Sequence, residues 1–184
     1  MLYEMFSLII NAIAGVLAGF LLLRFWMQAL RVRPPMSFAN SIFQLTDWIV
    51  KPIRRIVPGV LGLDWASLIA AWLVALAASC LLSLLSNRLD ISLMLVLSVY
   101  KMLQWAIYGL MGLLLLEVIF SFINPHAPLA PLVRALNQPF LSPIRRVIPP
   151  IGGFDFSVLV AFIILQLLER GLAAMMSQLL YYLL

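Results

Sequence analysis

Charged residues are scarce in this sequence. Of its 184 residues, 12 are Lys or Arg and 7 are Asp or Glu, so charged side chains make up 10% of the chain while 65% is hydrophobic. Soluble globular proteins are about one quarter charged and about half apolar. A soluble domain of this length could not bury so much apolar surface. The composition therefore predicts an integral membrane protein, most of which is surrounded by lipid.

Residue types that carry chemistry are also few. Cys80 is the single cysteine, which excludes an intrachain disulfide and a cysteine-based metal site. His126 is the single histidine and has no set of metal ligands around it, so it is a weak basis for haem ligation. No nucleophile elbow, phosphate-binding glycine loop or paired-carboxylate motif occurs. We expect neither an enzyme nor a metal or cofactor site. We also expect no cleavable signal peptide, because Glu4 but no Lys or Arg precedes the first apolar run.

Long apolar runs dominate the rest of the chain. A membrane-spanning helix needs about 20 mostly apolar residues, and four segments qualify, at about 5–30, 67–85, 102–123 and 156–180. The apolar stretch 91–100 has two interpretations. It extends the third span, or it lies flat at the interface with Lys101 marking the boundary. The predicted fold class is an all-α membrane protein with four transmembrane helices.

Two long loops, at about 31–66 and 124–155, contain apolar residues at helical spacing. In the first loop these residues are Phe38, Ile42, Leu45 and Ile49, and in the second they are Leu129, Leu132, Leu136 and Phe140. Polar residues occupy the other faces, a pattern typical of short amphipathic helices in the interface plane. Prolines lie before and after an Arg-Arg pair in each loop, and we expect them to confine each pair to a turn.

The chain contains an internal repeat. Adding 91 to a residue number carries Pro52, Arg54, Arg55, Pro58 and Asp64 onto Pro143, Arg145, Arg146, Pro149 and Asp155. A shift of 93 carries Asn11 to Gln104 and Arg24 to Glu117. The predicted repeats are residues 1–87 and 88–184, each with a span, a flat helix, an Arg-Arg turn and a second span. Because each repeat has two spans, both must run in the same direction, related by an axis along the membrane normal.

The doubled motif P-I-R-R-h-h-P (h, hydrophobic), followed by Gly and Asp at the start of a span, resembles the YggT family of bacterial membrane proteins. The resemblance covers nearly the whole chain. It implies a small inner-membrane protein with no known reaction, from a family linked to osmotic or potassium stress, to division and, in plastids, to cytochrome assembly. The first copy departs from the second because Ala66 stands where the second has Ser157. The first copy therefore has no hydroxyl group at this position.

The formal charge of +5 indicates orientation in the membrane rather than direct binding of nucleic acid. Basic residues concentrate on the side of the two long loops, where they are Arg31, Arg33, Lys51, Arg54, Arg55, Arg134, Arg145 and Arg146. The loop between the repeats offers Arg88, or two basic residues if Lys101 is counted there. Because cytoplasmic loops carry an excess of Lys and Arg, we expect the Arg-Arg loops in the cytoplasm and both termini in the periplasm.

The Arg-Arg pairs have three possible roles. They bind anionic lipid phosphates, worth about 1 kcal/mol each near the surface, or they form ion pairs within the loop, or they dock a partner. We expect Asp64 and Asp155 to cap the spans that they precede. One Arg of each pair is expected within ion-pair reach of that Asp. The first two roles are compatible if one Arg of each pair faces lipid and the other faces the Asp.

Polar residues inside the spans are the remaining candidates. Arg24 and Glu117 occupy matching positions and are expected to form a buried ion pair between the repeats. The alternatives are that Arg24 extends alone to the interface, or that the residues belong to an ion pathway. Asn11 and Gln104 are expected to hydrogen-bond across the same interface. Near the middle of the last span, the cluster Gln166, Glu169 and Arg170 predicts a water-filled cavity or a polar contact with another subunit.

Two functional hypotheses remain. The first is a non-enzymatic inner-membrane scaffold, or an assembly or stress-tolerance factor, whose basic loops contact anionic lipid headgroups, a membrane-protein partner or a second copy of the chain. The second is a component of ion transport in osmotic or potassium homeostasis. A continuous polar track would favour transport, and the polar residues in this sequence are scattered.

Overall fold

The structure is a computed structural model that describes residues 2–59, 62–86, 90–148 and 155–183. These residues form six α-helices. They are α1 (Leu2–Ala29), α2 (Met36–Ile56), α3 (Trp65–Leu85), α4 (Ile91–Ile123), α5 (Ala130–Val147) and α6 (Ser157–Leu183). Helices α1, α3, α4 and α6 are long and apolar enough to cross a membrane. The predicted class, an all-α protein with four transmembrane helices, is confirmed.

The stretch 91–100, which the sequence left open, is the beginning of α4 and not a separate interfacial segment. Asp90 caps this helix, because its carboxylate accepts hydrogen bonds from the N–H groups of Ser92 and Leu93. Hydrogen bonds, first from the Ser92 hydroxyl and then from the backbone, lower the pKa of Asp90. At 1.5 Å per residue, the 33 residues of α4 span about 50 Å, longer than the hydrocarbon core of a bilayer.

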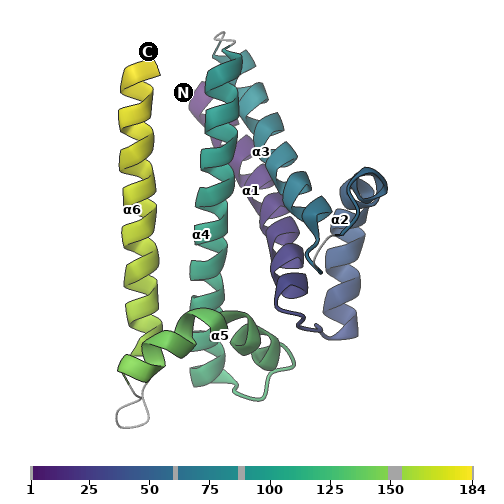
Figure 1. Cartoon of the computed structure of the whole chain (residues 1–184), viewed down its shortest axis with the longest axis vertical. Helices are drawn as coiled ribbons and strands as arrows, with labels where there is room; N and C mark the ends of the chain where they lie inside the picture. The colour runs from purple at the N-terminus through teal and green to yellow at the C-terminus, as the bar shows by residue number, and fades with distance from the viewer. Residues whose placement is uncertain (1, 60–61, 87–89, 149–154, 184) are drawn as a thin grey trace.

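The four spans alternate in direction. In Figure 1, α1 and α4 run from the upper end of the molecule to the lower end, and α3 and α6 run back up. The two chain ends therefore lie at the same end of the molecule, opposite α5. Each half of the chain thus contributes one descending and one ascending span, so the two halves run in the same direction, as the repeat predicts.

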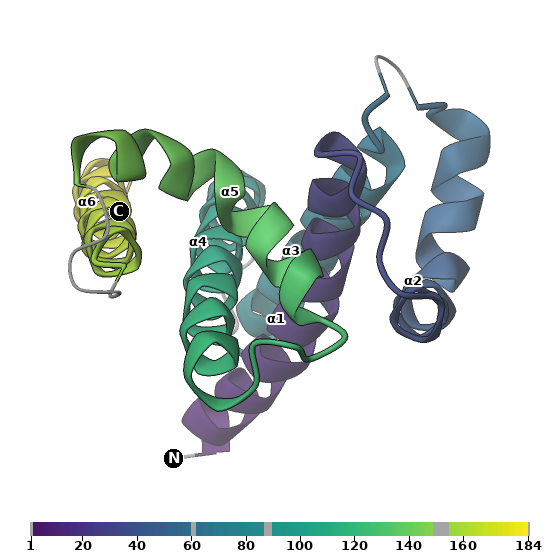
Figure 2. The ribbon, with the colours of Figure 1, turned by 90° about the horizontal axis from the view of Figure 1, so that it is seen from below.

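Helices α2 and α5 replace the expected combination of a short helix and a separate turn. The Arg-Arg pair lies in the last turn of each helix, and Pro52, Pro139 and Pro143 lie in helix interiors. The expectation that prolines would place each pair in a turn is therefore wrong. An interior proline removes one hydrogen bond and bends a helix without always ending it. Figures 1 and 2 show both helices as bent ribbons.

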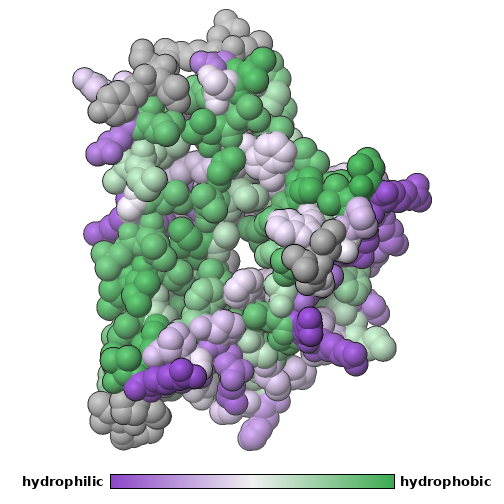
Figure 3. All heavy atoms as spheres, in the orientation of Figure 1, coloured by the Kyte–Doolittle hydropathy of each residue, from purple (hydrophilic) through white to green (hydrophobic). Residues whose placement is uncertain are grey.

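The two amphipathic helices lie differently against the spans. Figures 1 and 2 show α5 crossing the lower ends of the spans, from beside α1 to α6, as an interfacial helix does. In contrast, the first part of α2 runs alongside α1 and only its last part turns across the long axis. In Figure 3, hydrophilic surface gathers over α5 at the lower end and over α2, whereas apolar surface covers α4 and α6.

The spans of the first repeat pack more tightly than those of the second. Ala66, Ala70 and Ala71 of α3 are fully buried against Leu21 of α1 and Val50 of α2. In the second repeat, the residue equivalent to Ala71 is Phe162, and α6 lies apart from α4 over much of its length in Figure 1. Small residues let two helices approach closely, and a bulky one holds them apart.

Candidate functional site

A buried charge cluster lies at the lower end of α1. The guanidinium of Arg24, with the residue 7% exposed, donates to Asp47 Oδ1 at 2.7 Å and to the Thr46 hydroxyl at 2.9 Å, both on α2. Its Nε lies 3.5 Å from Asp64 Oδ2. The ring of Phe43 covers the guanidinium at 4.7 Å, a cation–π contact. Arg24 thus connects α1 to α2 and to the start of α3.

Asp47 lies at the more exposed edge of this cluster. It accepts from Arg24 on one oxygen and pairs with Lys51 through the other at 2.9 Å. Burial by itself would raise the pKa of Asp47. The hydrogen bonds from Arg24 and Lys51, together with their positive charges, outweigh burial and lower this pKa. Asp47 is therefore held as a carboxylate.

Asp64 is the second acid of the first repeat and is 1% exposed. Its carboxylate accepts from Arg54 Nη2 at 2.5 Å and from the Ser67 hydroxyl at 2.6 Å. Asp64 occupies the N-cap position of α3, but its side chain accepts no backbone N–H there, so the predicted side-chain cap is absent. The predicted Arg–Asp contact is present. Ser67 also supplies the hydroxyl that the first copy lacks at Ala66.

The second repeat has a related cluster centred on Arg145. Its guanidinium contacts Asp155 Oδ2 through Nε at 2.8 Å and through Nη2 at 2.6 Å, and Nη2 also lies 3.1 Å from Glu117. Asn137 donates to Glu117 at 2.7 Å and to the carbonyl of Leu113. Burial alone would lower the pKa of Arg145, but the two carboxylates outweigh it and raise this pKa.

Asp155 caps the following span, as predicted. Its Oδ1 accepts from the N–H of Ser157 at 3.0 Å and from the hydroxyl of the same residue. Burial would raise the pKa of Asp155, but these bonds and Arg145 lower it overall. Both repeats therefore contain an ion pair between an Arg in the amphipathic helix and an Asp ten residues later.

The predicted ion pair between the repeats is absent. Within the described residues, Arg24 pairs with Asp47 and Asp64, and Glu117 pairs with Arg145. Each of the two residues faces the amphipathic helix of its own repeat. Thr46 and Asn137, which the shift of 91 relates, hydrogen-bond them in opposite directions, because Thr46 accepts from Arg24 and Asn137 donates to Glu117. The sequence places Arg24 and Glu117 at matching positions but does not reveal which neighbour each contacts.

The predicted hydrogen bond between Asn11 and Gln104 is also wrong. Asn11 donates to the carbonyl of Ser7 and accepts from Lys101 at 2.8 Å. Gln104 is oriented toward the other side of α4, where it donates to the hydroxyls of Tyr100 and Tyr108 and to Glu169 of α6. Residues three apart on α4 thus contact α1 and α6 separately, and α4 joins the two repeats.

The predicted cluster on the last span has one member that reaches another helix. Glu169 accepts from Gln104 at 3.2 Å and from Tyr108 at 3.1 Å. Gln166 and Arg170 are exposed on α6. These contacts form a polar layer around Glu169. Along α4 that layer is separated from Glu117 by the apolar and glycine residues 109–116.

The second arginine of each pair is exposed. Arg55 and Arg146 project from the last turns of α2 and α5, and Pro52, Pro58 and Pro143 are exposed as well. Pro149 lies outside the described residues. Arg55, Lys51 and Asp47 line a shallow cleft of about 330 Å³. In the part of the chain that the structure describes, no three His, Cys, Asp or Glu side chains can share a metal ion.

Several residues of these clusters were not predicted. Thr46, Asp47, Ser67 and Asn137 lie in or beside the loops and complete the bonds of the predicted charges. One signal in the sequence could have found two of them. Thr46 and Asn137 are equivalent polar residues six positions before the proline of each Pro-Ile-Arg-Arg motif, and each lies four residues after an apolar residue of the same helix face, Ile42 or Val133.

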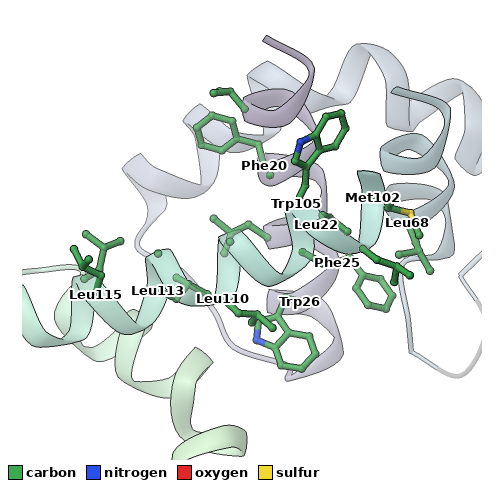
Figure 4. A pocket seen from close by; sticks show the side chains of 18 residues that line it. Phe20, Leu22, Phe25, Trp26, Leu68, Met102, Trp105, Leu110, Leu113 and Leu115 are labelled. Carbon is green, nitrogen blue, oxygen red and sulfur yellow. The ribbon is translucent and has the colours of Figure 1, made fainter. Parts of the chain in front are cut away.

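Two further contacts join the repeats near the lower end. Trp26 of α1 donates to the carbonyl of Leu136 and stacks on Phe140 of α5, with ring centroids 5.5 Å apart. Above them, α1 and α4 leave an apolar groove of about 680 Å³. Figure 4 shows Phe20, Trp105 and Leu110 among the side chains around it. The repeats therefore meet through aromatic and apolar contacts and the Lys101–Asn11 hydrogen bond rather than through the predicted ion pair.

Comparisons with known proteins place this architecture in one family. The family model CCB3/YggT matches residues 3–85 and again 96–176, one match for each half of the chain. A protein of Vibrio alginolyticus, named "Uncharacterized protein in proC 3'region", is 32% identical over 87% of this chain and 89% of its own length. "Uncharacterized protein YggT" of Escherichia coli K12 is 28% identical over 85% of this chain and 83% of its own.

A third relative, from Haemophilus influenzae, is 29% identical over 89% of both chains. No solved structure matches the chain at a significant level. The double match extends over nearly all the residues that form the four spans and both charge clusters. The chain is therefore a member of the CCB3/YggT family, with the family unit present twice.

Proposed function

We propose that this protein is a non-enzymatic scaffold or assembly factor of the bacterial inner membrane. Its partner-binding surface is the pair of basic helix ends formed by Arg55 on α2 and Arg146 on α5. A stress-tolerance role belongs to the same proposal, because it would act through the partner. The partner is a membrane protein or a second copy of this chain, in a bilayer with anionic headgroups.

One observation carries the proposal. In each Arg-Arg pair, the first arginine is tied to an aspartate at the start of the next span, whereas the second is exposed and makes no ion pair with a described carboxylate. The tie fixes the last turn of the amphipathic helix to the span, so the neighbouring guanidinium projects from a rigid base. Arginine can bind carboxylate or phosphate through a planar fork of donors. This division of roles occurs in both repeats and suits presentation of charge more than catalysis.

Transport is the second candidate function. The polar layer around Glu169 supports it, because ionisable residues inside spans often mark ion pathways. On α4, however, residues 109–116 between that layer and the lower charge cluster are leucine, methionine and glycine. An ion path along α4 would need polar groups there. The scaffold proposal therefore has the stronger support.

The test uses the full chain in its native membrane. A photocrosslinking amino acid replaces Arg55 or Arg146, and the controls carry it at Ile13 or Leu81, which are exposed on the spans. A partner that crosslinks from both basic positions and from neither control supports a scaffold. Lipid-only adducts at both basic positions would leave no protein partner and would contradict it.

Flux measurements separate the two candidates. The purified protein is reconstituted into liposomes loaded with a potassium-sensitive dye, and empty liposomes serve as the control. The scaffold proposal expects no flux above the control. A potassium flux that disappears with Glu169→Gln would support transport and overturn the scaffold proposal.

The proposal also fixes an orientation. Because basic residues concentrate around α2 and α5, the positive-inside bias puts these helices in the cytoplasm and both termini in the periplasm. A reporter fused after Leu184 is expected to be active as a periplasmic protein. Cytoplasmic activity of that fusion would reverse the orientation and remove the basic surface from cytoplasmic partners.

A further inference from the structure

A second cleft lies at the corner between α4, α5 and α6. Its volume is about 830 Å³, within the range of about 300–1,000 Å³ that small-molecule sites occupy. Val118 and Leu115 of α4 and Leu159 and Phe162 of α6 form apolar walls. Charged residues form its other end, where Glu117, Arg134, Arg145 and Asp155 line it. The cleft is therefore apolar along the spans and charged where the spans meet α5.

The cleft is open toward the surroundings of the spans. Leu159 is 58% exposed and Leu115 is 51% exposed, although both line it. In a bilayer these side chains face hydrocarbon. An acyl chain can therefore enter between α4 and α6 from the side, without passing through water.

The two arginines at the polar end of the cleft differ in their ionic partners. Arg145 is held by both Asp155 and Glu117. Arg134 is exposed, and no carboxylate in the described part of the chain pairs with it. In the first repeat the equivalent residue is Phe43, which covers Arg24. The second repeat thus has an unpaired guanidinium where the first has an aromatic ring closing its cluster.

We propose that this cleft binds one anionic phospholipid. Its phosphate binds Arg134 at the mouth, and one acyl chain lies between α4 and α6 against Phe162. An anionic amphiphile complements both ends of the cleft, since Arg134 offers charge-assisted hydrogen bonds and the walls offer apolar contact. This site is independent of a partner on Arg55 and Arg146, so either proposal can fail without the other.

The first experiment counts bound lipid. The full chain is purified with added phosphatidylglycerol or with zwitterionic phosphatidylcholine, and native mass spectrometry measures the lipid retained per chain. We expect one retained phosphatidylglycerol, and about five-fold weaker retention in Arg134→Gln, the effect of one arginine near an anionic group. Arg33→Gln is the matched control, because Arg33 is also exposed on the basic side of the molecule. Equal loss in both variants would overturn the site.

The second experiment locates the acyl chain. Phosphatidylglycerol with a diazirine in its acyl chain is photolysed with the reconstituted protein, and adducts are mapped by peptide mass spectrometry. We expect adducts concentrated in residues 114–122 and 156–162, and fewer of them in Leu159→Trp, whose larger side chain narrows the cleft between α4 and α6. Adducts spread evenly over the exposed spans would indicate bulk lipid only.

Covalent dimers from a photocrosslinker at residue 159 would assign the cleft to a second copy. Displacement by millimolar inorganic phosphate would assign Arg134 to a free anion.

Discussion

The two repeats share an Arg–Asp ion pair and differ in most of the residues around it. In both, an arginine of the amphipathic helix pairs with an aspartate ten residues later, Arg54 with Asp64 and Arg145 with Asp155. The span before each amphipathic helix carries a charge at a matching position, and its sign differs between the repeats: Arg24 in the first and Glu117 in the second. The cluster around Arg24 is buried, and the one around Arg145 is partly open.

This difference indicates what the repeat requires. A buried arginine on the first span is accompanied by an additional acid on α2, Asp47. A glutamate at the same position is accompanied by an amide on α5, Asn137, and shares the arginine of the tie. In each repeat the charge near the lower end of the first span, Arg24 or Glu117, is therefore balanced within that repeat, and the fold accommodates either sign. Comparing variants of the two repeats tests this interpretation.

Replacing Arg24 is expected to have the largest effect. Arg24→Met leaves the buried Asp64 with Arg54 as its only ionic partner among the described residues, and it removes the closest ionic partner of Asp47. Breaking a buried ion pair costs about 3–5 kcal/mol, so we expect a loss near 3 kcal/mol in the free energy of unfolding in mixed micelles. The matched change in the second repeat, Glu117→Gln, should cost about 1 kcal/mol, since Arg145 keeps Asp155. Equal losses would show that the two clusters do not differ as described.

Arginine-to-lysine substitutions compare the strengths of the two Arg–Asp ion pairs. Arg145 contacts two carboxylates through two nitrogens, whereas Arg54 contacts Asp64 through one. Lysine keeps the charge but lacks the planar fork. We expect Arg145→Lys to lower the free energy of unfolding by about 1–2 kcal/mol, and Arg54→Lys by less than half of that. If Arg54→Lys has the larger effect, the greater burial of Asp64 outweighs the number of contacts.

Lowering the pH should reduce the folding stability of both repeats. The folded-state pKa values of Asp47 and Asp155 are lowered, whereas an unfolded Asp titrates near about 3.9. The stabilisation is therefore fully present above that pH and is lost as the pH falls through the folded-state values. Unfolding midpoints measured from pH 5 to pH 2 should fall, and less steeply in Asp155→Asn and Asp47→Asn. Unfolding midpoints that rise as the pH falls would contradict this prediction.

The smallest expected effect is the coupling energy between Arg24 and Glu117, which should be close to zero. Because Arg24 and Glu117 have separate partners, the free-energy changes of Arg24→Met and Glu117→Gln should add within about 0.5 kcal/mol in the double variant. A double-mutant cycle of unfolding free energies measures this. A coupling energy above about 1 kcal/mol would indicate that Arg24 and Glu117 interact directly, which would contradict the structure.

The four spans, the repeat and the Arg–Asp ties could be predicted from the sequence, because each depends on composition or on local spacing. The partner of Arg24 could not be predicted, since it depends on the register of α2 against α1. The continuation of α2 through Pro52 was missed because the ring costs one backbone hydrogen bond, which packing of the helix on α1 and α3 can offset. The cleft at Phe162 depends on the separation of α4 and α6, which local patterns do not specify.

The self-contained clusters bear on the order in which the protein assembles. Every described ion pair of the first repeat joins residues between 24 and 64 of the chain. Its charges can therefore be neutralised as soon as α3 has entered the bilayer, while the ribosome is still synthesising α4. No buried charge of the first half has to wait for a partner from the second. A nascent chain with a single repeat already has the ionic contacts that hold its two spans and its amphipathic helix together.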